Sequence, residues 1–383
     1  TECGRWSANN AAARRRECES TGTDVVLGTA EFLPRAPGTG KVRVKVVGNN
    51  QKKQEVFVGE NCLLATGASA FRPPQIPFDG VRVFDSDSVA ALDYLPRSVA
   101  ISGAGIVAVE FAKIFRNLGC EVTLIFRGKS PKQALQKSGL DKDLTAALVS
   151  DLSRSGVIFA KDTTVCDFKC PPLLPKSQRK RLPLTVGLLS STGEKRKIKV
   201  DAFLAALGRR PRVPQGYAKA GIAVDEYDNV VVDSQLRAAP RIFGAGDTLG
   251  RPFLASVGVA QGIQAIEAMF VDEASSQQER QNSEVCDPDD ETSGGSSSCF
   301  GANYDPDSVN NNPFAFPIGI WSSPEVAWFG FTKAQAEQRG LKASEGMALY
   351  KEVLRGIVFS PDGLLKLVVD DQDHTIIGVH IVG

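Results

Sequence analysis

Apolar and polar residues alternate in short runs between residues 23 and 71 of the chain. The clearest runs are "DVVLGTAEFL", "KVRVKVVG" and "QEVFVGENCLLATG", and turn-forming residues separate them. Alternation with a period of two is typical of strands that bury one face against a core. We therefore predict a group of short antiparallel strands, the last of which is buried.

A helical period replaces this alternation at 106–118 and again at 141–155. The apolar run "SVAIS" precedes the first helix, a second run at 121–127 follows it, and a short run at 157–160 follows the second helix. Strands that alternate with helices form parallel sheets covered by those helices. The middle of the chain is therefore predicted to be an α/β unit.

Further along the chain, "KVDAFLAALGRRP" and "RIFGAGD" are predicted to contain buried strands, and a helix is predicted at 257–270. Residues 272–312 have almost no aliphatic side chains, so we expect disorder or a long solvated loop there. The proline-rich and basic residues 169–184 are interpreted as a surface insertion. From residue 313 a new unit begins, with antiparallel strands expected at "GIWSSPEVAWFGF", "GIVF", "LLKLVVD" and "TIIGVHIVG".

Length and charge limit the class of protein. A chain of 383 residues predicts two or three packed units, and a net charge of +1 favours neither nucleic acid nor an anionic membrane as partner. No apolar run approaches the ~18 residues that a membrane span needs. The eight cysteines include no C-x-x-C or C-x4-C pair, and the two histidines are far from Cys166 and Cys170. We expect a soluble protein without a metal site in a reducing compartment, the cytoplasm being favoured and an organelle left open.

The strongest motif lies between the first predicted strand and helix. It comprises Gly103, Ala104, Gly105, Ile106, Val107 and Ala108. Gly103 permits a tight turn, Gly105 lets the backbone approach a pyrophosphate, and Ala108 is small enough for the helix to pack on the strand. The first helical amides would then face the phosphates. The motif predicts a dinucleotide site, although glycines that only pack a helix on a sheet remain an alternative.

Basic residues occupy the position that selects between the two nicotinamide dinucleotides. An acid at the end of the second strand, roughly 20 residues past the glycines, would hold a ribose 2′-hydroxyl. This chain has Arg127, Lys129 and Lys132 there. Cations can pair with a 2′-phosphate, and arginine does so through two parallel hydrogen bonds. NADP is favoured over NAD, and simple solvation of these side chains is the alternative.

The order of the surrounding motifs resembles a known family. "LLATGASAFRPP" precedes the glycine motif, "AALGRRP" closes its unit, and "RIFGAGDTLGRPFLASVGVAQG" follows. The chain resembles the flavin-dependent class I pyridine nucleotide–disulfide oxidoreductases, the family of glutathione reductase and dihydrolipoamide dehydrogenase. "VFDSDSVAALDYLPRS" and "WSSPEVAWFGFT" make it most similar to the soluble Si-specific NAD(P) transhydrogenases. The resemblance extends from about residue 21 to residue 383, apart from the insertions.

That resemblance implies roles for particular residues. Glu110 would lie near the contact between nicotinamide and flavin, and Gly208 and Arg209 would border the NADP cleft. The residues implied at the FAD are Thr66, Gly67, Gly246, Asp247, Leu254, Ala255 and Ser256. Among these, Asp247 would hydrogen-bond the ribityl chain. His380 is expected to be structural and not a catalytic base.

The same resemblance implies an α/β fold with two Rossmann-like domains that bind FAD and NAD(P), the first of them incomplete, and the start of an α+β interface domain. The FAD domain would comprise 1–95 and 214–270 and be split by the NAD(P) domain at 96–213. A disordered insertion at 271–312 would precede a partial dimerisation domain at 313–383. We expect a fragment of a longer homodimeric enzyme that holds FAD poorly by itself.

Three functions remain open for such a chain. The first passes hydride from NADPH through FAD to a second pyridine nucleotide, NAD. The second is a disulfide reductase similar to glutathione reductase or dihydrolipoamide dehydrogenase, in which a cysteine pair outside this chain would take the electrons. The third is an NADP-binding remnant without chemistry. In all three, the partners are small nucleotides.

Overall fold

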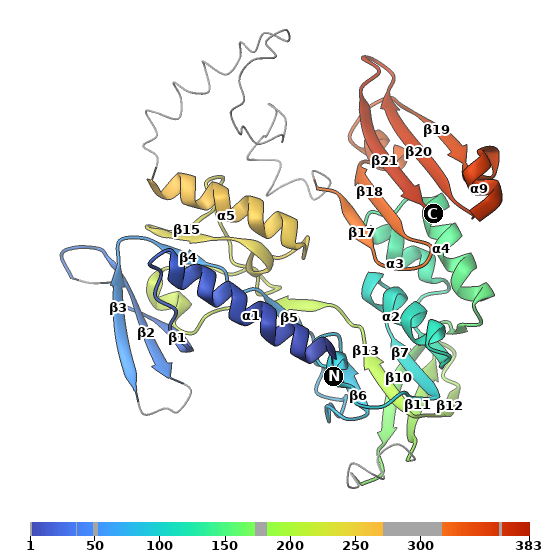
Figure 1. The fold of residues 1–383 in the computed structure, drawn as a ribbon, viewed down its shortest axis with the longest axis horizontal. Coiled ribbons are helices and arrows are strands. Elements are labelled where there is room, and N and C mark those ends of the chain that lie inside the picture. The colour runs from blue at the N-terminus through green and yellow to red at the C-terminus, as the bar shows by residue number, and fades with distance from the viewer. Residues whose placement is uncertain (1, 36, 49–52, 173–181, 271–315, 360–361) are drawn as a thin grey trace. The chain divides into compact units, whose positions relative to one another are not determined.

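The computed structural model describes residues 2–35, 37–48, 53–172, 182–270, 316–359 and 362–383, which form two compact units (Figure 1). Unit 1 comprises Thr1–Val25, Ala70–Arg209 and Phe316–Gly383. Unit 2 comprises Val26–Ser69 and Arg210–Ala315. The expected insertion at 271–312 lies outside the described residues. Two of the boundaries between the units fall within β5 (Ala68–Ala70) and β14 (Arg209–Pro211), strands that pair with each other.

A five-stranded parallel sheet forms the centre of unit 1, in the order β6-β13-β7-β8-β9. Its strands are β6 (Val83–Asp85), β7 (Ser98–Ser102), β8 (Glu121–Ile125), β9 (Ile158–Ala160) and β13 (Ala202–Ala205). All four residues of β13 are buried, as its continuous apolar run predicts. The predicted α/β sheet is confirmed. It also includes β6, which lies N-terminal to the domain boundary expected at residue 96.

The two helices predicted for this sheet are α2 (Ile106–Asn117) and α4 (Lys142–Arg154), and a further helix that was not predicted, α3 (Pro131–Lys137), lies between them in the chain. Ser130 and Asp141 cap the starts of α3 and α4 with their side chains. The start of α2 has glycine at this position and therefore no side-chain cap. A 3-10 turn, η1 (Val89–Ala91), precedes β7.

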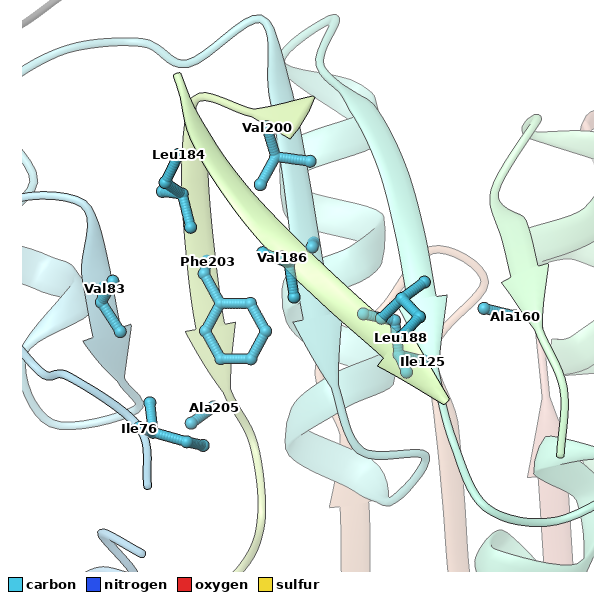
Figure 2. Packing of buried hydrophobic residues seen from close by; sticks show 11 residues of the cluster. Ile76, Val83, Ile125, Ala160, Leu184, Val186, Leu188, Val200, Phe203 and Ala205 are labelled. Carbon is cyan, nitrogen blue, oxygen red and sulfur yellow. The ribbon is translucent and has the colours of Figure 1, made fainter. Parts of the chain in front are cut away.

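A small antiparallel sheet packs on the parallel one through a shared apolar core (Figure 2). Its strands are β10 (Thr163–Lys169), β11 (Leu184–Ser190) and β12 (Lys195–Val200). Phe203 of β13 is fully buried in this core, with its ring edge-on to Phe168 at a centroid distance of 4.9 Å. The ends of the expected insertion, residues 169 and 184, belong to β10 and β11, and its residues 173–181 lie outside the described chain.

The C-terminal part of unit 1 is a five-stranded antiparallel sheet in the order β17-β18-β21-β20-β19. The strands are β17 (Ile318–Ile320), β18 (Val326–Gly330), β19 (Ala343–Leu349), β20 (Leu364–Asp370) and β21 (Ile376–Val382), and α8 (Lys333–Gln338) follows β18. Three of the four segments predicted as strands here contain them. The prediction of a strand at "GIVF" is wrong.

These four residues belong to a short helix, α9 (Leu354–Phe359), which follows the 3-10 turn η6 (Tyr350–Glu352). The amide of Ile357 donates to the carbonyl of Val353, a helical hydrogen bond. An apolar run of four residues does not distinguish a strand from a helix, because both patterns fit so short a segment. A second helix, α1 (Glu2–Ser20), also had no counterpart in the prediction.

Unit 2 contains the antiparallel strands expected near the N-terminus: β1 (Gly28–Leu33), β2 (Val42–Gly48) and β3 (Gln54–Gly59). Its second sheet has the order β15-β16-β4, in which β4 (Cys62–Leu64) runs parallel to β16 (Ile242–Gly244). The last strand of the predicted antiparallel group is therefore not antiparallel, and of its residues only Leu64 is buried. β15 is Arg237–Ala239, the 3-10 turns are η3 (Tyr217–Ala220) and η4 (Gly246–Leu249), and α5 is Ala255–Phe270. An apolar cluster beside this sheet contains Leu236, Phe243 of β16 and, from α5, Ala265.

Candidate functional site

The glycine turn between β7 and α2 has the geometry that its sequence predicts. Gly103 has a φ of +132°, and a β-carbon there would lie 2.2 Å from the carbonyl oxygen of Ala206. Only glycine fits such a position. Gly105 is extended, and a β-carbon built on it would meet no atom within 4 Å. The backbone at Gly105 therefore faces open space that a ligand could enter.

The start of α2 lies directly behind this opening. Gly105 is the N-cap, so no side chain accepts a hydrogen bond from the first helical amides. Ile106 and Val107 are partly exposed, whereas Ala104 and Ala108 are buried against the sheet. Free amides at the positive end of a helix bind phosphate. The turn and the helix start together fit the pyrophosphate of a dinucleotide.

The basic residues lie just past the carboxyl end of the neighbouring strand β8. Phe126 is buried, and Arg127, Lys129 and Lys132 are exposed. Among the described residues, these three side chains have no hydrogen-bond or ion-pair partner. Three unpaired cations beside the glycine turn leave their charge available to an anionic ligand.

Gly208 and Arg209 lie beyond the carboxyl end of β13, at the same edge of the sheet as the glycine turn. Gly208 has a φ of +97°, and its carbonyl accepts a hydrogen bond from the amide of Phe71. The guanidinium of Arg209 pairs with the Asp87 carboxylate at 2.5 Å. Ligands of open α/β sheets bind outside the carboxyl ends of the strands, so the placement of both residues suits a cleft border.

Glu110 lies one turn into α2 and is half-buried. Its Oε1 accepts a hydrogen bond from the backbone amide of Trp321, at 2.8 Å. Burial raises the pKa of Glu110, and the hydrogen bond from Trp321 offsets part of that rise. Sequence reasoning missed Trp321 as a partner, because 211 residues separate it from Glu110.

The residues implied at the flavin lie in unit 2. The hydroxyl of Thr66 donates to the Arg212 carbonyl at 2.6 Å and lies 3.1 Å from the Thr248 hydroxyl. Gly67 has a φ of +68°, and its carbonyl accepts from the amide of Arg212. These contacts fix the backbone after β4.

The second group of implied flavin residues surrounds η4 and the start of α5. Gly246 has a φ of +76° and donates its amide to the side chain of Gln261 at 2.8 Å. Asp247 follows within η4, and Ala255 and Ser256 are exposed in the first turn of α5, directly after the partly exposed Leu254. No α-helix follows "GAG" at 244–246 at once: the 3-10 turn η4 comes next, and α5 begins at Ala255.

The two sets of residues differ in how well they fit a dinucleotide. Unit 1 offers a glycine turn, an uncapped helix and three cations. Unit 2 offers a strand end, the η4 turn and the start of α5, but among its described residues no glycine turn leads directly into an α-helix. The described residues of unit 2 therefore do not include the usual pyrophosphate-binding element of a dinucleotide site.

Other chemistry has little support among the described residues. They contain no group of three or more His, Cys, Asp or Glu side chains able to hold a metal, and no helix long and apolar enough to cross a membrane. His380 is fully buried, with its Nε2 3.0 Å from the carbonyl oxygen of Phe331, and burial lowers its pKa. This placement agrees with its interpretation as a structural residue.

Known proteins resemble this chain in sequence and in fold. It is 27% identical over 367 residues to the soluble pyridine nucleotide transhydrogenase of Pseudomonas entomophila, an alignment that covers 94% of this chain and 65% of the relative. LpdA from Mycobacterium tuberculosis has the same fold, with a TM-score of 0.76 and 21% identity over 99% of this chain and 72% of that one. The HOCl-induced flavoprotein disulfide reductase RclA from Escherichia coli also shares this fold, with a TM-score of 0.69 and 22% sequence identity, over 94% of this chain and 69% of that one.

The chain spans about two thirds of the length of such curated relatives, 65% for the one described. Residues 10–262 match the pyridine nucleotide-disulphide oxidoreductase family, and residues 316–383 match the dimerisation domain of the same family. The first match includes the glycine turn, the cations and the residues around η4. This chain therefore belongs to the pyridine nucleotide-disulphide oxidoreductases.

Proposed function

We propose that this chain is the NADP-binding part of a flavin-dependent oxidoreductase that passes hydride from NADPH, through FAD, to a second pyridine nucleotide such as NAD. The observation that carries the proposal is the open turn at Gly105 in front of the uncapped start of α2. The three unpaired cations after β8 support the choice of NADP over NAD.

Different residues of unit 1 are proposed to bind different parts of the nucleotide. Gly103, Ala104 and Gly105 shape the turn, and the amides of Ile106, Val107 and Ala108 face the pyrophosphate. Arg127, Lys129 and Lys132 would pair with the 2′-phosphate. Gly208 and Arg209 border the cleft on the side of β13.

Glu110 acts at the nicotinamide end of the same cleft. The nicotinamide gives up a hydride and the flavin accepts it, so the protein has to orient two rings and exclude water. The hydrogen bond from Trp321 holds the Glu110 carboxylate in one orientation, and its half-buried position keeps solvent from one side. Glu110 is thus proposed as the residue that positions the nicotinamide.

Unit 2 supplies part of the flavin site. Thr66 and Gly67, which follow β4, would border the flavin, and Gly246 and Asp247 would hold its ribityl chain. Leu254, Ala255 and Ser256, at the start of α5, would hold the ring. Because the described residues of unit 2 lack a phosphate-binding glycine turn, this chain is expected to hold FAD weakly.

Transfer to a pyridine nucleotide is preferred to transfer to a disulfide. The curated relatives carry the name of soluble transhydrogenases. The match of residues 316–383 to the dimerisation domain supports a second copy of the chain as partner.

Calorimetric titration of the purified chain tests the nucleotide site. NADP+ and 2′,5′-ADP should bind more tightly than NAD+ and 5′-AMP, because only the first pair carries a 2′-phosphate. Arg127→Ala should weaken 2′,5′-ADP by about tenfold, the value of one charge-assisted bidentate contact, and leave 5′-AMP unchanged. Lys137→Ala, which removes an exposed cation at the far end of α3, is the matched control. Equal affinity for NAD+ and NADP+ would contradict the assignment of the cations.

A further inference from the structure

Lys366 of β20 is fully buried, with its ammonium group among three carboxylates. Its Nζ lies 2.9 Å from Asp141 Oδ1 and 3.5 Å from Glu345 Oε2, and it also contacts Asp143. A buried cation costs free energy unless ion pairs and hydrogen bonds compensate it. Lys366 is therefore held tightly in this one arrangement.

Asp141 connects this cluster to the start of a helix. Its Oδ1 also accepts the amide of Asp143 at 2.8 Å, the side-chain cap of α4. Glu345 of β19 makes a further ion pair with Lys142 at 3.3 Å. The first turn of α4 is thus fixed to strands β19 and β20 of the C-terminal sheet.

Helix α4 is in turn locked to α2, the helix that carries Glu110. The ammonium of Lys113 in α2 contacts Asp151 and donates to the Ser155 hydroxyl at 2.9 Å. Arg116 donates from its Nε to the Ser155 carbonyl at 2.7 Å. These contacts make α2 and α4 one body, so a shift of α4 moves Glu110 as well.

The C-terminal sheet carries the partner of Glu110. Strand β20 pairs with β21, and β21 pairs with β18. Trp321 lies between β17 and β18, and its amide donates to Glu110 at 2.8 Å. The helices α2 and α4 are therefore joined to the C-terminal sheet at two separate points: the Glu110–Trp321 hydrogen bond and the ion cluster around Lys366.

We propose that Lys366 is a positioning residue for Glu110: its buried ion cluster fixes the C-terminal sheet on α4 so that the Trp321 amide meets the Glu110 carboxylate. This role rests on the proposed function, because it makes the placement of the nicotinamide depend on a residue of the C-terminal sheet. An apolar side chain could fill the same volume and stabilise the core equally well. It would not select the one placement in which the amide meets the carboxylate.

Hydrogen exchange at the Trp321 amide measures this hydrogen bond directly and needs no bound nucleotide. The chain has three tryptophans, so labelling with 15N-tryptophan gives a simple NMR spectrum. Trp321 is 80% exposed, and its amide donates to Glu110 Oε1, so we expect protection of this amide to come from that hydrogen bond. Trp328, 2% exposed in the paired strand β18, reports on opening of the sheet as a whole.

Lys366→Met should speed exchange at Trp321 by about tenfold through local opening and leave Trp328 unchanged. Glu110→Ala should speed exchange at Trp321 to a similar degree, and the double variant should add little. Lys366→Arg restores the charge and should recover part of the protection. Asp143→Asn is a milder change at a partly exposed partner of Lys366 and should also speed exchange at Trp321. It serves as the test if Lys366→Met does not fold.

Exchange that rises equally at Trp321 and Trp328 in both Lys366→Met and Asp143→Asn would overturn the proposal, because the cluster would then only stabilise the fold. A Trp321 amide that is unprotected in the wild type, or unaffected by these variants, would overturn it as well. Titration of the wild type with NADP+ separates this result from the proposed function. Normal exchange behaviour without NADP+ binding would refute the function and leave the positioning contact in place.

Discussion

Alanine at Gly103 and alanine at Gly105 should have opposite effects, although the two residues belong to one turn. A β-carbon at Gly103 would lie 2.2 Å from the Ala206 oxygen and 3.0 Å from its carbonyl carbon. Both atoms are backbone at the end of β13, so neither can rotate away. The residue also has a φ of +132°, where an L side chain costs about 1–3 kcal/mol.

Forcing a methyl group into packed surroundings adds a similar amount, about 1–3 kcal/mol. Gly103→Ala should therefore lower the free energy of unfolding by about 2–6 kcal/mol, a large part of the about 5–15 kcal/mol of a whole domain. Urea denaturation followed by tryptophan fluorescence measures this loss, because Trp328 is buried in unit 1. Nucleotide binding should fall only as far as the folded fraction falls.

Gly105→Ala should leave stability nearly intact. The residue has φ −82° and ψ −173°, which any amino acid adopts, and its β-carbon would point into open space. Exchange of an N-cap glycine for alanine costs about 1 kcal/mol or less. The methyl group would, however, occupy the approach to the backbone. NADP+ should bind at least about tenfold more weakly, or about 1.4 kcal/mol.

The pair of variants tests the open turn more sharply than either one alone. If Gly105→Ala binds NADP+ as the wild type does, the pyrophosphate does not approach this turn and the assignment of the site is wrong. If Gly103→Ala is as stable as Gly105→Ala, the close approach to Ala206 does not constrain the fold. Circular dichroism of both variants shows whether the secondary structure is retained.

Two further predictions concern Glu110 and the flavin. Burial raises the pKa of Glu110, so its charged form destabilises the folded state. The protonated carboxyl contributes fully to the stability of the protein below the ordinary pKa of 4.5. This contribution is lost as the pH rises through the pKa of Glu110 in the folded state. Glu110→Gln, whose amide oxygen can still accept from Trp321, should therefore unfold at higher urea concentration than the wild type at neutral pH, and the difference should vanish below pH 4.5. The purified chain should contain substoichiometric flavin and quench added FAD weakly, whereas a stoichiometric yellow protein would contradict the incomplete flavin site.

The β7–turn–α2–β8 segment was predictable because its signals are local. Residues 98–125 contain, in order, a buried strand, a glycine that the packing requires, a glycine that leaves the backbone open, and a segment with helical period. Each of these signals depends on neighbours a few residues away, so the sequence contains the whole argument. The placement of Arg127 after β8 follows from the same short stretch.

The partners of Glu110 and Lys366 could not be predicted in this way. Their contacts join residues 211 and 225 positions apart, and no spacing rule connects such distant segments. One signal was nevertheless present. In "LLKLVVD" the alternation places Lys366 on the same face as Leu364 and Val368, and a lysine on the buried face of a strand requires a carboxylate partner. The sequence could thus indicate a buried ion pair but not its identity.

The division of the site residues between the units makes nucleotide binding and flavin binding separable. The glycine turn, the cations, Glu110, Trp321 and Lys366 all belong to unit 1, whereas the residues proposed for the flavin belong to unit 2. We therefore expect affinity for the adenosine half of NADP to be a property of unit 1 alone, since the residues proposed to contact it lie on the parallel sheet or its loops. A chain with weak FAD binding can therefore still select NADP, and loss of one ligand does not imply loss of the other.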